Sequence, residues 1–103
     1  MNSAEIAAAV ATLAQAAPNA EQILLFGSYA RGQADAGSDL DLLVIESTVE
    51  NRAREMVRLR RVLRPLRLPV DVLVYSRAEV DQWGQQPGTA LYWALKEGQV
   101  VHG

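Results

Sequence analysis

Apolar positions along the chain switch between helical and extended spacing, and this pattern predicts the order of the elements. From residue 3 to residue 16 apolar side chains recur at helical spacing behind Ser3, a favourable N-cap, which predicts an amphipathic helix. Three short runs that are almost wholly apolar, at 23–26, 39–45 and 70–75, predict buried strands.

The remaining segments return to helical spacing. Residues 50–66 combine an apolar stripe with arginines, and Pro65 breaks this helix near its end. Ser76 and Glu79 form the capping box of a shorter helix. A last helix is expected at 89–97, and Val100 begins a short apolar pair that could close the sheet as an edge strand.

Alternating strands and helices favour one sheet covered by helices. We therefore expect an α/β (α+β) fold with a mixed β-sheet, including a short helical segment between the first two strands. The chain of 103 residues has no internal repeat or linker, so residues 1–103 are expected to form a single domain.

Composition narrows the chemistry. The chain has no cysteine and one histidine, His102, which excludes thiolate chemistry and argues against a serine–histidine triad or a histidine-rich metal site. Any metal ion would be held by oxygen ligands. The net charge of −2 gives no sign of direct nucleic-acid binding. Without a signal peptide or a long apolar run, we expect a cytoplasmic protein that makes no membrane contact.

Three aspartates are the first candidates for chemistry. Asp39 and Asp41 are two residues apart on a predicted strand, so their side chains should share one face. Like charges at this spacing repel one another unless a cation lies between them. Asp71 interrupts an otherwise apolar strand and would join them if the two strands are neighbours. Such a trio could hold two metal ions at a phosphoryl-transfer site, and Asp71 could accept a proton.

A Gly-Ser pair ends the first strand. Gly27 would allow the backbone to approach a phosphate closely, and the Ser28 hydroxyl could donate to a phosphate oxygen. Arg31 could add positive charge or fasten the loop to a strand end. Each feature is common by itself, but together they place an anion cradle shortly before a candidate metal site.

The order and spacing of these residues resemble a known signature. The stretch from Gly27 to Ala34, followed by Ser38-Asp39-Leu40-Asp41, resembles the G-S-x-A-R-G and S-D-x-D motifs of the polymerase β-like nucleotidyltransferase superfamily. Its minimal nucleotidyltransferases are the most similar group, and they are about one domain long. A third carboxylate on a later strand is expected in this family, and Asp71 matches it.

The resemblance implies a function and a set of roles. Gly27 and Ser28, with Arg31 and Ser38 from the same motifs, would bind the nucleotide, and Asp39, Asp41 and Asp71 would be metal ligands and catalytic groups. The cofactor would be Mg²⁺, two ions per site, and the substrate ATP. Many minimal nucleotidyltransferases are antitoxins that transfer AMP to tyrosines of a HEPN-domain ribonuclease toxin, as in type VII-like toxin–antitoxin pairs. A hetero-oligomer with such a toxin is therefore expected.

Two alternatives remain open. The chain could be a binding antitoxin that blocks its partner by occlusion, although three converging aspartates are not needed for binding alone. It could also transfer a nucleotide to a small molecule such as an aminoglycoside, although it is short for enclosing one. Seven of the ten basic residues lie between Arg52 and Arg67, on a helix that either faces solvent or docks an acidic partner. For docking, the arginines away from the apolar stripe are the candidates: Arg52, Arg54, Arg58 and Arg61.

Overall fold

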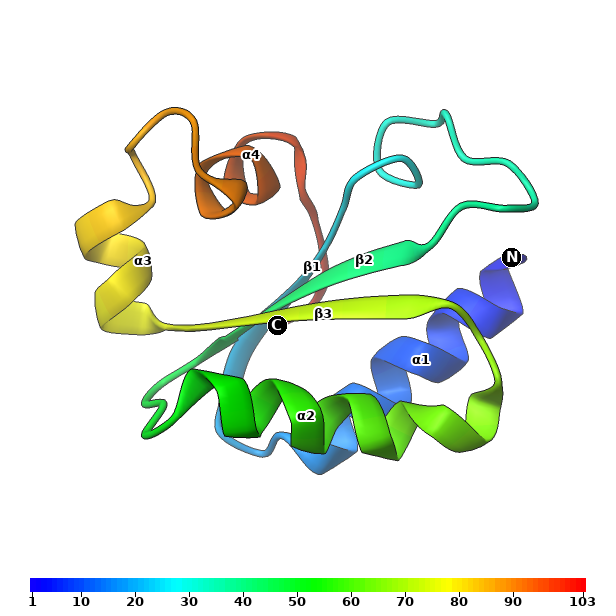
Figure 1. Cartoon of the computed structure of the whole chain (residues 1–103), viewed down its shortest axis with the longest axis horizontal. Helices are drawn as coiled ribbons and strands as arrows, with labels where there is room; N and C mark the ends of the chain where they lie inside the picture. The colour runs from blue at the N-terminus through cyan, green and yellow to red at the C-terminus, as the bar shows by residue number, and fades with distance from the viewer.

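The computed structural model describes residues 1–103 as a four-stranded sheet with helices on both faces (Figure 1). The elements, in chain order, are α1 (Ser3–Ala16), β1 (Ala20–Phe26), β2 (Leu40–Glu46), α2 (Arg52–Leu63), the short 3₁₀ helix η1 (Arg64–Leu66), β3 (Val70–Ser76), α3 (Arg77–Trp83), α4 (Ala90–Glu97) and β4 (Gln99–His102). This confirms the mixed-sheet α+β fold that the hydrophobic pattern predicts.

The sheet has the order β3-β2-β1-β4. Strands β2 and β3 are parallel, and β1 is antiparallel to both β2 and β4. Helix α2 connects the parallel pair and lets both strands run in one direction. Both strands consequently begin at the same end of the sheet, next to the long connection between β1 and β2 (Figure 1).

Side chains of β2 alternate between two apolar layers. Leu40, Leu42 and Val44 pack with α1 and α2, whereas Leu43 and Ile45 pack with α3 and α4 on the opposite face (Figure 1). All five side chains are completely buried. The polar residues of the strand therefore occupy its two ends, where the covering layers stop.

Helix ends follow their capping residues. Helix α2 begins at Arg52 rather than Glu50, because the Asn51 side chain accepts a hydrogen bond from the Arg54 N–H. Ser76 and Glu79 form the expected capping box of α3. Asn2, rather than Ser3, is the N-cap of α1.

The short helix expected between β1 and β2 is absent. Residues 27–32 form consecutive turns in which the α-helical i→i−4 hydrogen bond occurs once, from the Arg31 N–H to the Gly27 carbonyl at 3.1 Å. Gly27 and Gly32 both have positive φ angles, 74° and 70°, which interrupt a right-handed helix. Any anion bound here would therefore meet turn N–H groups, without the dipole of a multi-turn helix.

Two arginines of α2 cover the outer edge of β3. Arg52 Nε donates to the Val74 carbonyl at 3.0 Å, and Arg60 Nη2 lies 3.4 Å from the Val72 carbonyl. Arg52 also pairs with Glu79 and stacks over the Tyr75 ring. These contacts use the backbone acceptors that an edge strand would otherwise offer to another strand.

None of the helices combines the length and apolar character that a membrane crossing requires.

Candidate active site

The closest contact among the candidate residues joins Gly27 to Asp41. Phe26, the last residue of β1, pairs with Asp41 on β2, so the chain leaves β1 directly beside the aspartate. A Cβ atom built on Gly27 would overlap the Asp41 carboxylate, and Gly27 has a φ of 74°. Only glycine combines this backbone angle with this proximity. The sequence thus brings the phosphate-loop candidate and a carboxylate into direct contact.

Asp71 lies next to Asp41 in the sheet. The two residues are register partners in the parallel pair β2–β3, so their side chains leave the sheet on the same face. Burial raises the pKa of the Asp41 carboxyl, and the negative charges of Asp71 and then Asp39 raise it further, while Arg31 acts in the opposite direction. A raised pKa of this kind is expected where carboxylates lie close together without a cation between them.

Asp39 and Ser38 precede β2 rather than belonging to it. Asp39 is exposed, at the end of the connection from β1. The Ser38 side chain belongs to a tight loop, in which its hydroxyl accepts from the Asp35 N–H at 3.0 Å and donates to Asp35 Oδ1 at 3.3 Å. Ser38 therefore fixes the loop that delivers Asp39 to the site, and its role in nucleotide binding stays a prediction.

Arg31 fastens the turn segment to Glu97, the last residue of α4. Its Nη1 donates to Glu97 at 2.9 Å, and its Nε donates to Gln33 at 3.1 Å. Gln99 supports the same segment by donating to the Ala30 carbonyl at 3.2 Å. The sequence left two roles open for Arg31, adding positive charge or fastening the loop, and these hydrogen bonds are the contacts of the fastening role. The Ser28 hydroxyl makes no hydrogen bond within the chain.

The side chains of the three aspartates do not converge on a common point. Asp71 Oδ1 accepts from Arg60 Nη2 at 2.7 Å and from the Val72 N–H at 3.1 Å. No three His, Cys, Asp or Glu side chains lie close enough to hold a metal ion. The donor chemistry nevertheless fits a hard divalent cation, because Asp41 is destabilised by two further carboxylates. Both hydrogen bonds of Asp71 use Oδ1, which leaves its Oδ2 without a hydrogen bond in the chain.

Arg60 is the contact that sequence reasoning missed. It sits on α2, eleven residues before Asp71, and reaches past the edge of β3 to the aspartate. The apolar stripe of α2 indicates which residues face the core, but it does not indicate where a long arginine side chain ends. Two of the four arginines expected to be free for docking, Arg52 and Arg58, are also engaged within the chain.

Comparisons with known proteins identify the family of the chain. The family model for the nucleotidyltransferase domain matches residues 5–91. The chain belongs to this family. No curated protein is similar enough in sequence to count as a match.

Solved structures share the fold. A proposed nucleotidyltransferase from Sulfolobus solfataricus is 26% identical, with a TM-score of 0.65 over 93% of this chain and 75% of that one. A chain of a toxin–antitoxin complex with AMP-PNP is 18% identical, with a TM-score of 0.65 over 93% of this chain and 72% of that one. A mutant of the toxin–antitoxin pair MntA–HpeT gives 19% identity and a TM-score of 0.64, over 100% of this chain and 73% of that one.

Membership of the family supports a transferase that uses a nucleoside triphosphate and a divalent metal ion. The matched region includes every candidate site residue, from Gly27 to Asp71. The Gly27–Asp41 contact and the register of Asp41 with Asp71 therefore lie within the region that the family model matches.

Proposed function

We propose that this nucleotidyltransferase transfers AMP from ATP to a tyrosine hydroxyl of a HEPN-domain ribonuclease toxin and acts as its antitoxin. The observation that carries the catalytic part is the contact of Gly27 with Asp41, with Asp71 beside it in register. A glycine backbone that touches a carboxylate places a phosphate-binding turn and a cation-binding group within reach of the same ligand.

Each residue has a role in this proposal. The turn at Gly27 and the free Ser28 hydroxyl bind the phosphates, while Asp39 and Asp41 hold Mg²⁺, with Asp71 completing the ligand set. The bound cation would supply charge neutralisation for the triphosphate and for the leaving pyrophosphate. The acceptor oxygen attacks the α-phosphorus in line, pyrophosphate leaves, and Asp71 accepts the hydroxyl proton.

A toxin partner is supported by the neighbouring structures. Two of them are toxin–antitoxin complexes, and one of these was determined with AMP-PNP, an ATP analogue. Their low identity establishes the fold alone, so the HEPN domain, the tyrosine acceptor and ATP as the donor are part of the proposal. The cytoplasm, where such a toxin would meet ribonucleic acid, is the proposed location.

Intact-mass spectrometry of a co-expressed toxin tests the proposal. The toxin encoded beside this chain is expressed with the wild-type protein, with Asp41→Asn or with the matched control Asp81→Asn, an exposed aspartate on α3. We expect the toxin to gain one or more AMP masses with the wild type and the control only. An unmodified toxin that still forms a stable complex with the wild type would favour occlusion and reject protein AMPylation.

A further inference from the structure

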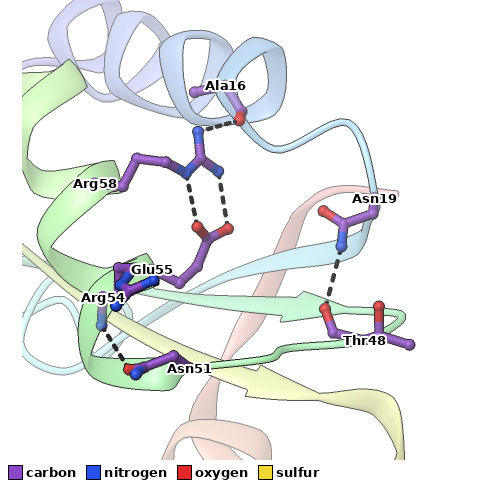
Figure 2. A network of polar contacts seen from close by, with 7 residues as sticks. All are labelled: Ala16, Asn19, Thr48, Asn51, Arg54, Glu55 and Arg58. Atoms are coloured by element: carbon purple, nitrogen blue, oxygen red, sulfur yellow. Dashed lines mark hydrogen bonds and ion pairs between the residues drawn. The ribbon is translucent and has the colours of Figure 1, made fainter.

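A second polar cavity lies at the opposite end of β2 from Asp41. Its volume is about 330 Å³, and it is formed where β2 ends, α2 begins and the α1–β1 turn passes. Eight of its nine lining residues are polar or charged: Asn19, Glu46, Thr48, Glu50, Asn51, Arg54, Glu55 and Arg58. Figure 2 shows the hydrogen bonds that hold most of this wall in place. The proposed transferase chemistry uses none of these residues.

Glu46 is the exceptional residue of this wall. It is the last residue of β2, it is 1% exposed, and its Oε2 atom has no hydrogen-bond partner. Burial and the neighbouring Glu55 carboxyl raise the pKa of Glu46 to about 7, so Glu46 retains its proton in mildly acidic solution. A buried oxygen without a hydrogen-bond donor lowers the stability of the fold. A ligand that brings an N–H or O–H group to this oxygen would remove that cost.

The other charges near Glu46 are already balanced. Arg58 donates from Nε and Nη2 to the two Glu55 oxygens, at 2.7 Å and 2.8 Å, and from Nη1 to the Ala16 carbonyl at 2.8 Å (Figure 2). Glu55 and Arg58 therefore form a closely bonded pair, and Arg58 makes no hydrogen bond to Glu46 Oε2. Of the remaining lining charges, Glu50 and Arg54 are both exposed and form no ion pair within the chain.

This arrangement selects a cationic donor. An anion would face the unpartnered Glu46 oxygen with no gain, although Arg54 and the start of α2 could attract it. A metal ion would need at least three oxygen ligands, and the cavity offers no such group. A primary ammonium group brings three donors and a positive charge in a small volume, which suits one buried carboxylate oxygen and the Glu50 carboxylate near it.

We propose that this cavity binds a primary ammonium group, from a free amine or from a lysine side chain of a partner protein, with Glu46 as its acceptor. Because Glu46 accepts from the ammonium group as a carboxylate, the proton that it carries in acid leaves to the buffer when the ligand binds. Binding is therefore weaker in acid and stronger in mildly alkaline solution. The groups facing Glu46 are Glu55 and Arg58 of α2, and they stay paired with each other.

Calorimetric titration of the full chain tests the site. The probes are putrescine and N-acetyl-lysine methylamide, and the uncharged control is N-acetyl-norleucine methylamide. Each titration is repeated in PIPES and HEPES buffers near neutral pH, whose different ionisation heats reveal released protons. We expect both amines to bind with proton release and the norleucine compound not to bind. The amine that binds more tightly distinguishes a free amine from a protein side chain as the source.

Two variants separate Glu46 from its surroundings. Glu46→Gln keeps the shape of the side chain but cannot ionise, and it should weaken amine binding about tenfold or more. Glu50→Gln, on the exposed rim, should weaken it by about twofold. Should Glu46→Gln fail to fold, proton release by the wild type still decides the matter. The proposal is overturned by any of three results. Neither amine binds, the norleucine compound binds as well as the amines do, or folded Glu46→Gln binds the amines as tightly as the wild type.

Discussion

The two ends of β2 carry carboxylates in opposite circumstances. At the beginning of the strand, Asp41 lies between Asp39 and Asp71, touches the Gly27 backbone, and makes no hydrogen bond to any donor side chain. At the end, Glu46 is buried under α2, and its neighbour Glu55 is held by two hydrogen bonds from Arg58. Both carboxyls have raised pKa values with burial as the largest cause, and in both cases a neighbouring carboxylate adds to it.

The difference lies in how each end relieves the repulsion. The pKa of Glu46 is raised to about 7, which favours its neutral form, and Arg58 donates to both oxygens of Glu55, so this end is stable without a metal ion. At the Asp41 end, Arg60 pairs with Asp71 from the sheet edge, and the Arg31 charge lowers the pKa of Asp41 while Arg31 pairs with Glu97. The remaining negative charge of this end stays open to an incoming cation. A carboxylate cluster thus indicates catalysis when its repulsion is left unrelieved and accessible.

Neutralising Asp41 should have the largest effect. Asp41→Asn removes the central ligand while keeping its shape, and transfer should fall by about three orders of magnitude. Because burial and two like charges raise the pKa of Asp41, the folded state favours the neutral form, and the variant should melt at the same or a slightly higher temperature. Thermal melting and nucleotide transfer are measured together. A large loss of stability would show that Asp41 is structural.

Gly27 and Gly32 offer a matched pair for the next effect. Both have positive φ, but a Cβ at Gly27 overlaps Asp41, whereas a Cβ at Gly32 meets nothing within 4 Å. Each alanine variant should lose about 1–2 kcal/mol of stability from backbone strain. Only Gly27→Ala should also lower transfer, by about 100-fold, because it displaces the carboxylate. Equal activity in the two variants would remove the Gly27–Asp41 contact from the mechanism.

The Glu46 end should be visible in the pH dependence of stability. The folded state raises the pKa of Glu46 from 4.5 to about 7, so its contribution to stability is complete below pH 4.5 and is lost as the pH rises to about 7. Glu55 behaves oppositely: its pKa falls to about 2, chiefly through Arg58, and its contribution is lost as the pH falls from 4.5 to about 2.

Stability should therefore be greatest near pH 4.5 and decline on both sides. Chemical denaturation between pH 4 and 8 should show the wild type losing roughly 2 kcal/mol, and Glu46→Gln losing much less, because glutamine has no proton to lose. Glu50→Gln, which changes an exposed carboxylate, should follow the wild type. If the free energy of unfolding depends on pH in the same way for the wild type and Glu46→Gln, then Glu46 is not the group that causes the decline.

Most of the fold follows from local patterns in the sequence. The strands at 23–26, 39–45 and 70–75 and the capping box at Ser76 lie where the periodicity predicts them, within a few residues. The prediction of a short helix after Gly27 was wrong, because two glycines with positive φ produce turns there. The polar composition of the segment does not distinguish such turns from a short helix. Local sequence fixes the type of most elements, while special backbone angles decide the exceptions.

The candidate site follows from sequence only in part. The spacing of Asp39 and Asp41, together with an acid inside the third strand, is readable, and the register of Asp41 with Asp71 bears out the expected adjacency. Glu46 is a polar residue at a strand end in the sequence, and its burial depends on how α2 crosses the sheet. The partners of Asp71 and Glu46 depend on such tertiary approach, which no local pattern encodes.

The smallest expected effect concerns Arg60, which forms an ion pair with Asp71. Its pair with Asp71 is exposed on both sides, 45% and 54%, so Arg60→Ala should change stability by less than about 1 kcal/mol. A metal ion bound by Asp71 would compete with Arg60 for the negative charge of this carboxylate, and loss of Arg60 should therefore raise Mg²⁺ affinity about twofold to threefold in calorimetric titrations. Arg61→Ala, which removes a neighbouring exposed arginine without an ion pair, is the control for general loss of positive charge. If both variants gain Mg²⁺ affinity equally, removal of a positive charge near the site explains the change; if neither gains, Asp71 is not a metal ligand.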